Sequence, residues 1–183
     1  MPTSSGPVGP FPPRVENDEQ RDEYDRLRRR VLWTMPSGLY VVGSADGERK
    51  NLMTLNWATQ VSSDPKLVGI GVEKSALTHG LIERGRAFSV CILSREDRAI
   101  VRKFTKPVEA DSPDTLNGFP CRTGRTGAPI LTQAVAAFEC EVRHAVDVGS
   151  HTFFIGEIVD AGFQQPEDTP VLRMEDTRMN YGG

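Results

Sequence analysis

The spacing of hydrophobic residues divides the chain into a helical segment followed by a series of short strands. Within a charged stretch, apolar residues recur at steps of three, four and one, at Tyr24, Leu27, Val31 and Leu32. This spacing predicts a helix over Glu16–Leu32 with a narrow apolar stripe, ended by Pro36 and Gly38. We therefore expect a Pro/Gly-rich disordered tail over residues 1–15, because prolines and glycines favour neither helix nor central strand, a charged helical arm over 16–34, and one domain over 35–183.

After Gly38 the pattern indicates strands. Apolar runs over 39–44 and 52–58 flank Asp46-Gly47, a strong hairpin signal. Buried strands are expected at 67–72 and 87–93, and two long antiparallel strands at 134–146 and 152–161, with Gly149-Ser150 at their turn. Several short strands without regular strand–helix alternation predict a mainly β protein, an antiparallel barrel with helical insertions.

Three segments between these strands are expected to differ from them. A short helix would start with Ser75 as its N-cap, bury Leu77, Leu81 and Ile82, and end at Gly85. The segment 95–104 resembles a second short helix. The stretch 106–126 mixes Pro, Gly, Asp and Thr with few apolar residues, which predicts a long surface loop of the kind that often forms a functional lid.

Composition narrows the classes of partner. The 183 residues contain 22 Lys+Arg, 25 Asp+Glu and 38% hydrophobic residues, which suits one core and gives no basic footprint for nucleic acid or an acidic membrane. No apolar run is long enough to span a bilayer, and the amino terminus has no secretory pattern. The sequence thus favours a small-molecule partner and a cytoplasmic location.

The candidate chemistry is limited by what the sequence lacks. It contains no Rossmann, Walker, zinc-protease or serine-elbow motif. Cys91, Cys121 and Cys140 are widely separated, which indicates reduced structural thiols, and His79, His144 and His151 are too scattered for a metal cluster. We therefore expect no metal site and no nucleophilic cysteine.

Two features could hold a flat, phosphorylated ligand. Gly69 and Gly71 share one face of a strand, so a ligand could approach closely there, although barrel curvature also uses strand glycines. Lys74 precedes a helix start with Ser75 and Thr78, where free N–H groups and two hydroxyls make an anion site. An ordinary helix cap is the alternative for the second feature.

Within Gly47–Leu93, the run G-E-R-K-N-L-M-T-L-N-W-A-T-Q-V-S-S-D-P-K-L-V-G-I-G-V-E-K-S-A-L-T-H-G-L-I resembles the flavin reductase-like family, whose members adopt the FMN-binding split barrel. Segments 134–142 and 149–158 (G-S-H-T-F-F-I-G-E-I) are similar to the second half of that family. The order of these parts matches over most of the chain, so the resemblance implies the split-barrel fold.

The resemblance also implies a flavin site. The residues it assigns to the isoalloxazine ring are Thr54, Leu55, Asn56 and Trp57, with Ser62 and Ser63 bordering the same pocket. Those it assigns to the flavin phosphate are Lys74, Ser75 and Thr78, and Lys103 with Phe104 would lie near the flavin tail. His151 would face the place where nicotinamide stacks on the flavin, as the catalytic histidine. Ser150 stands where the family has Asp, and Cys91 where relatives often have Asn.

The resulting expectation is a homodimeric flavin reductase. It would bind FMN, or FAD, and accept hydride from NADH or NADPH, and reduced flavin could pass to a partner monooxygenase. Without a Rossmann motif, NAD(P)H would stack against the flavin and the 106–126 segment. Two alternatives stay open: a flavin electron carrier or a reductase with another donor such as a deazaflavin, and a protein that binds FMN, haem or another planar ligand without turnover.

Overall fold

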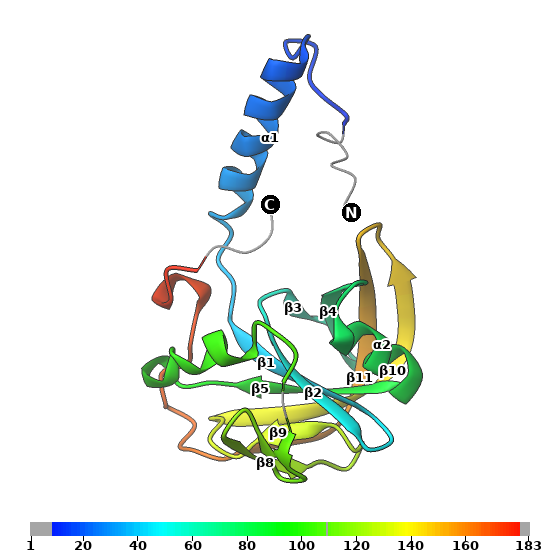
Figure 1. Ribbon diagram of the computed structural model, residues 1–183, viewed down its shortest axis with the longest axis vertical. Coiled ribbons are helices and arrows are strands. Elements are labelled where there is room, and N and C mark those ends of the chain that lie inside the picture. Colours follow the sequence, from blue (N-terminus) through cyan, green and yellow to red (C-terminus); the bar gives the residue numbers. More distant parts are fainter. Residues whose placement is uncertain (1–8, 109, 180–183) are drawn as a thin grey trace. The chain divides into compact units, whose positions relative to one another are not determined.

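The computed structural model describes residues 9–108 and 110–179 (Figure 1). The chain divides into a smaller unit of residues 1–36 with 178–183, and a larger unit of residues 37–177. No helix among the described residues is both long and apolar enough to cross a membrane.

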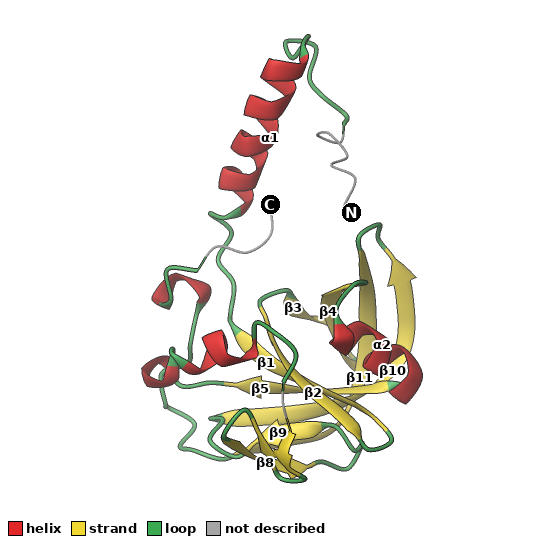
Figure 2. Cartoon of the chain, in the orientation of Figure 1, coloured by secondary structure: helices red, strands yellow, loops and turns green. Residues whose placement is uncertain are grey.

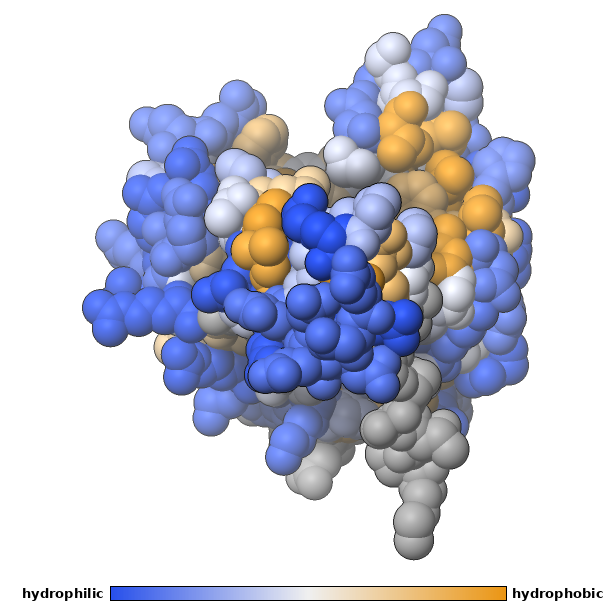
Figure 3. All heavy atoms as spheres, turned by 90° about the horizontal axis from the view of Figure 1, so that it is seen from above, coloured by the Kyte–Doolittle hydropathy of each residue, from blue (hydrophilic) through white to orange (hydrophobic). Residues whose placement is uncertain are grey.

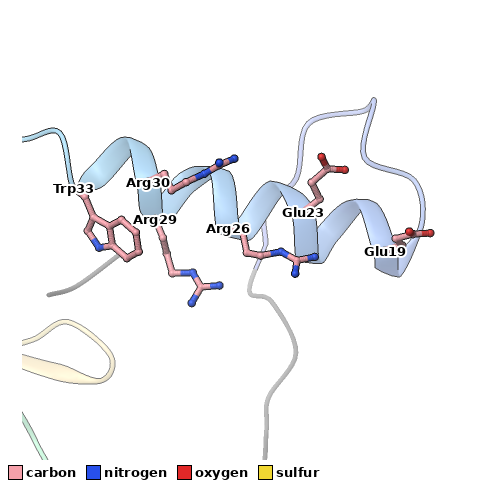
Figure 4. A pocket seen from close by; sticks show the side chains of 6 residues that line it. All are labelled: Glu19, Glu23, Arg26, Arg29, Arg30 and Trp33. Atoms are coloured by element: carbon pink, nitrogen blue, oxygen red, sulfur yellow. The ribbon is translucent and has the colours of Figure 1, made fainter. Parts of the chain in front are cut away.

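The smaller unit is built on α1 (Asp18–Leu32), which confirms the predicted helix with a start two residues later. The side chain of Asn17 accepts a hydrogen bond from the Gln20 backbone N–H at 2.9 Å, and the Gln20 side chain accepts one from the Asn17 backbone, so a capping box fixes the start. Acidic residues in the first turn and arginines in the last turn complement the helix dipole (Figure 4).

Residues 9–15 pack on α1. The Phe11 ring lies edge-on to Tyr24 with centroids 6.3 Å apart, and the guanidinium of Arg28 lies 5.2 Å from the Phe11 centroid. The described part of the predicted tail is therefore held by aromatic and cation–π contacts. Residues 1–8 of that predicted tail lie outside the described residues.

The larger unit is an antiparallel seven-stranded sheet in the order β2-β1-β5-β10-β11-β4-β3 (Figures 1 and 2). Its strands are β1 (Tyr40–Asp46), β2 (Arg49–Leu55), β3 (Ala58–Ser63), β4 (Lys66–Glu73), β5 (Ala87–Ile92), β10 (Ala136–Asp147) and β11 (His151–Phe163). β2 and β3 are the two edges, yet only Asn56 and Trp57 separate them along the chain. The sheet must therefore curl until its edges approach, which confirms the predicted antiparallel barrel architecture.

Both predicted hairpins are present. β1 pairs with β2 so that Asp46 faces Arg49, and Gly47 takes the left-handed conformation that the two-residue turn requires (φ +59°). β10 pairs with β11 over most of its length. One strand prediction was wrong: 52–58 is not continuous, because the chain leaves one sheet edge at Leu55 and enters the other at Ala58.

Helical insertions and a second sheet complete the unit. α2 (Leu77–Gly85) lies between β4 and β5, and the predicted helix over 95–104 is two 3₁₀ segments, η1 (Arg95–Asp97) and η2 (Ile100–Phe104). A third, η3 (Met174–Asp176), follows β11. The prediction of a loop without strands over 106–126 was wrong, because about half of this segment forms strands of a small antiparallel sheet. Its strands are β6 (Ala110–Ser112), β7 (Thr115–Leu116), β8 (Phe119–Thr123) and β9 (Pro129–Leu131).

Buried polar contacts fasten the small sheet to the main one. The Glu139 side chain is 1% exposed and accepts hydrogen bonds from the backbone N–H groups of Arg125 and Thr126 at 2.9 and 2.8 Å. The Ser89 hydroxyl donates to the Pro129 carbonyl at 2.6 Å. A buried carboxylate is tolerated when several donors solvate it, so this part of the expected lid is anchored at its carboxyl-terminal end.

The core lies inside the curled sheet and under α2. Phe88, Phe154 and Ile70 are fully buried there. All three cysteines are free and buried, and desolvation raises the pKa of Cys91 and Cys140 to about 12 and that of Cys121 to about 11. These thiols stay protonated near neutral pH, as structural rather than nucleophilic groups do.

Candidate functional site

One end of the main sheet gathers several of the predicted site residues. The Trp57 and His151 rings lie with centroids 4.8 Å apart at 53°. The Gly71 N–H donates to the Trp57 carbonyl at 2.9 Å, and His151 lies opposite Glu73 in the β4–β11 register. Residues from the β2–β3 connection, β4 and β11 therefore meet at this end.

The two strand glycines, Gly69 and Gly71, leave space that aromatic side chains of the same chain occupy. A Cβ on Gly69 would overlap the Phe153 ring, and one on Gly71 would lie 3.3 Å from Trp57 Cε3. The close approach that the sequence suggested is thus made by Phe153 and Trp57. Because Gly71 has no side chain, Trp57 can pack closely against β4, beside His151.

Two buried polar atoms beside Trp57 have no hydrogen-bond partner within the described residues: Asn56 Oδ1 and His151 Nε2. Asn56 is only 8% exposed, and the His151 ring is held from its other side by a 2.8 Å hydrogen bond between Nδ1 and the Ser150 hydroxyl. Buried polar groups are normally paired. Asn56 Oδ1 is an acceptor, and His151 Nε2 can donate or accept according to its tautomer. These two atoms therefore suit a ligand that carries both donors and acceptors, as a flavin does.

The amino terminus of α2 lies close to His151 in space, because the Lys74 N–H just before the helix donates to the Ser150 carbonyl at 3.0 Å. The predicted Ser75 cap was wrong: the N-cap is Ala76, which is extended and cannot cap, so α2 has no side-chain cap. Lys74 and Ser75 are exposed beside the uncapped N–H groups. Free N–H groups with a neighbouring ammonium suit a phosphate.

Lys74 is also paired with the β10–β11 hairpin. Its ammonium lies 2.7 Å from Asp147 Oδ2, and its backbone N–H donates to the Ser150 carbonyl at 3.0 Å. The hydrogen bond from Lys74, followed by that from the Gly149 N–H, holds the pKa of Asp147 below its ordinary value. The hairpin tip therefore sets the position of Lys74, and the Asp147 carboxylate partly neutralises the charge of the Lys74 ammonium.

Thr78 faces the interior. It is fully buried, and its hydroxyl accepts a hydrogen bond from Asn51 Nδ2 at 2.8 Å. Next to it, His79 Nε2 and the Thr152 hydroxyl are hydrogen-bonded at 2.7 Å. In this structure Thr78 stabilises the first turn of α2 from inside, and the groups that reach solvent are Lys74 and Ser75.

The remaining predicted residues lie in three places: beside η2, in the core, and at the far end of β3. The Thr54 hydroxyl donates to the Val101 carbonyl, which brings β2 next to η2 and the exposed Lys103. Leu55 belongs to the core. Ser62 and Ser63 lie at the far end of β3, because Ser63 pairs with Lys66 at the turn whereas Ala58 pairs with Ile70. At about 3.3 Å per residue, this places them away from Trp57.

Sequence reasoning missed the polar groups around α2. A surface depression of about 580 Å³ lies beside the helix start, and its lining includes Arg49 and Arg84 as well as Lys74. Arg84 is paired with Asp46 at 2.6 Å. No local pattern marks these arginines, since a charge on a hairpin or a helix is usually only solvated. The one clue in the sequence to polar contacts beneath α2 is Asn51, a polar residue at a buried strand position.

The chain is similar to known proteins over most of its length. Residues 32–182 match the family model described as the flavin reductase like domain. The chain is 37% identical over 155 residues to a ferric-chelate reductase (NAD(P)H) of Archaeoglobus fulgidus, covering 84% of this chain and 90% of that protein.

Two solved structures are also similar. The NADH:FAD oxidoreductase SgcE6 of Streptomyces globisporus superposes with a TM-score of 0.73 at 27% identity, over 97% of this chain and 98% of that one. BorF, the flavin reductase component of a bacterial two-component tryptophan halogenase, gives 0.69 at 30% identity, over 80% and 92%.

Proposed function

This chain belongs to the flavin reductase-like family, and we propose that it is an NAD(P)H-dependent flavin reductase whose flavin lies against the Trp57–His151 end of the sheet. The observation that carries this placement is the uncapped start of α2, with Lys74 beside it, at the same end as the two unpartnered polar atoms. A phosphate anchor and a polar, aromatic-lined ring site are what FMN requires.

A bound flavin would supply the redox chemistry, hydride transfer from a reduced nicotinamide, and this chemistry would need no protein acid or base. The protein supplies orientation and shelter from water. The α2 amino terminus, Lys74 and Ser75 would hold the phosphate end. Asn56 Oδ1, which has no partner within the described residues, would accept a hydrogen bond from the ring system, and the half-exposed Trp57 indole would shelter it from water.

His151 is the residue proposed to touch the reacting rings. Trp57 packs on it, and Ser150 fixes its Nδ1. In the tautomer where the Ser150 hydroxyl donates to Nδ1, Nε2 carries the proton and can donate to a bound nicotinamide or flavin. Ser150 orients the imidazole without the charge that the family aspartate would supply.

We further propose a homodimer. The β3 edge and the tip of the β10–β11 hairpin expose Trp57, Val61, Val146 and Val148 by 39, 44, 45 and 57%. Figure 3 shows that hydrophobic residues gather in patches on an otherwise mainly hydrophilic face. An open sheet edge with apolar side chains is normally covered. Light scattering that gives a flavin-loaded monomer would contradict this assignment.

The acceptor of the reduced flavin is proposed to be a separate monooxygenase in the cytoplasm, where reduced nicotinamide is available. BorF, similar to this chain over 92% of its length, is the reductase component of a two-component system. FMN is the proposed flavin and FAD the alternative, since SgcE6 is a NADH:FAD oxidoreductase.

An anaerobic absorbance titration tests the proposal. FMN is added to the purified protein, followed by NADH or NADPH. Binding with rapid loss of the oxidised flavin band supports a reductase and identifies its donor. Binding without bleaching would instead favour a flavin carrier. The observation that supports this alternative is Ser150, which stands where the family has an aspartate.

A further inference from the structure

A buried amide connects the proposed phosphate end of the site to the segment that enters the small sheet. Asn51, 3% exposed at the middle of β2, donates from Nδ2 to the Thr78 hydroxyl at 2.8 Å, and its Oδ1 accepts from the Val108 N–H at 3.0 Å. The three residues come from β2, the first turn of α2 and the connection before β6. One side chain therefore holds two elements that approach β2 from different parts of the chain.

The orientation of this amide follows from its partners. The Val108 backbone N–H can only donate, so the atom facing it must be the Asn51 oxygen. The amide nitrogen then faces Thr78, whose hydroxyl accepts. Because Asn51 and Thr78 are both buried, neither group can exchange the bond between them for one to water.

We propose that Asn51 is a positioning residue for flavin phosphate binding. This inference rests on the proposed function. Thr78 lies one residue after the first residue of α2, so the Asn51–Thr78 bond fixes the direction in which the uncapped N–H groups point. Without that bond the His79–Thr152 hydrogen bond still holds the third residue of α2, but no side-chain bond holds the residues before it, and helix ends fray readily. Asn51 itself touches no ligand.

The test compares FMN with riboflavin, which has the same ring but no phosphate. In Asn51→Leu, dissociation constants from flavin fluorescence quenching should show FMN binding weakened about tenfold and riboflavin binding unchanged. The single-turnover rate at saturating FMN and NADH should stay as in the unsubstituted protein. A purely structural residue would lower both affinities together or neither.

Substitutions at Thr78 provide a second, independent set. Thr78→Val removes the acceptor at constant shape and should reproduce the selective loss of FMN affinity, whereas Thr78→Ser keeps the hydroxyl and should retain it. If Asn51→Leu does not fold, this pair decides the matter. Combining Thr78→Val with Asn51→Leu should cost little FMN affinity beyond Asn51→Leu alone, because Asn51→Leu has already removed the bond to Thr78.

The outcomes separate this inference from the proposed function. If the unsubstituted protein binds riboflavin as tightly as FMN, the phosphate placement itself is refuted, and the role of Asn51 with it. If it prefers FMN and the preference survives both Asn51→Leu and Thr78→Val, only the inference is overturned.

Discussion

Lys74 and Asp147 are expected to shift FMN affinity in opposite directions. Their side chains are 40 and 74% exposed and lie 2.7 Å apart at the start of α2. An ion pair this exposed contributes little to stability. The same Lys74 charge near a bound phosphate changes ligand affinity instead. Even at the dielectric constant of water, the attraction between two opposite charges about 4 Å apart lowers a dissociation constant roughly fivefold.

Lys74→Met keeps the apolar stem and removes the charge. It also leaves Asp147 uncompensated beside the phosphate, so the two effects add and FMN affinity should fall about tenfold. Asp147→Asn removes the competing carboxylate and releases Lys74, and it should tighten FMN binding severalfold. Riboflavin affinity should change in neither variant, and both effects should shrink at high salt.

The matched control is Lys66→Met, which removes an exposed lysine from the β3–β4 turn, at the other end of β4. The assay is flavin fluorescence quenching with FMN and riboflavin at two ionic strengths, together with thermal melting to show that the fold is kept. The reasoning is refuted if riboflavin binding falls with FMN binding in Lys74→Met, or if Asp147→Asn weakens FMN.

Three further results are expected. Gly69→Ala should destabilise the protein by about 1–3 kcal/mol in urea unfolding because its Cβ overlaps the Phe153 ring, whereas Gly71→Ala should cost clearly less; equal costs would contradict the packing described. His151→Phe should preserve ring packing on Trp57 and the melting temperature but slow flavin reduction at saturating NADH about tenfold, because the Nε2–H that would orient the reacting rings is lost, and an unchanged rate would remove His151 from the site. The pKa of the buried thiols is raised, so native stability is fully present below their unfolded pKa of about 9 and falls as pH rises from there toward 12; a urea midpoint that rises between pH 8.5 and 10.5 would contradict this.

Sequence patterns predicted the parts of the fold whose signals are local. The β1–β2 hairpin follows from Asp-Gly between apolar runs, and α1 follows from its 3.6-residue stripe. The break at Asn56-Trp57 could not be predicted, because the alternation of side chains continues through it. Only the strand order of the curled sheet shows that the chain passes there from one edge to the other. Strands of two to five residues in the small sheet are too short to show a period.

The part of the candidate site that local sequence motifs mark could also be predicted from the sequence. The resemblance to family motifs identifies Trp57 and His151, and both that resemblance and the predicted helix start identify Lys74. The structure brings the three residues to one end of the sheet. Ser75 was assigned as a cap from its residue type, but the helix starts one residue later. Asn51 could not be given a role, because its partners lie 27 and 57 residues away.

The central claim is that hydride passes from nicotinamide to a flavin held by this protein. Anaerobic stopped-flow mixing of the FMN-loaded protein with NADH, and with NADH deuterated separately in each of the two C4 positions, tests it most directly. The account predicts bleaching of the oxidised flavin much faster than without protein, slowed by deuterium in one C4 position only. Flavin that binds but bleaches no faster than in buffer would contradict it.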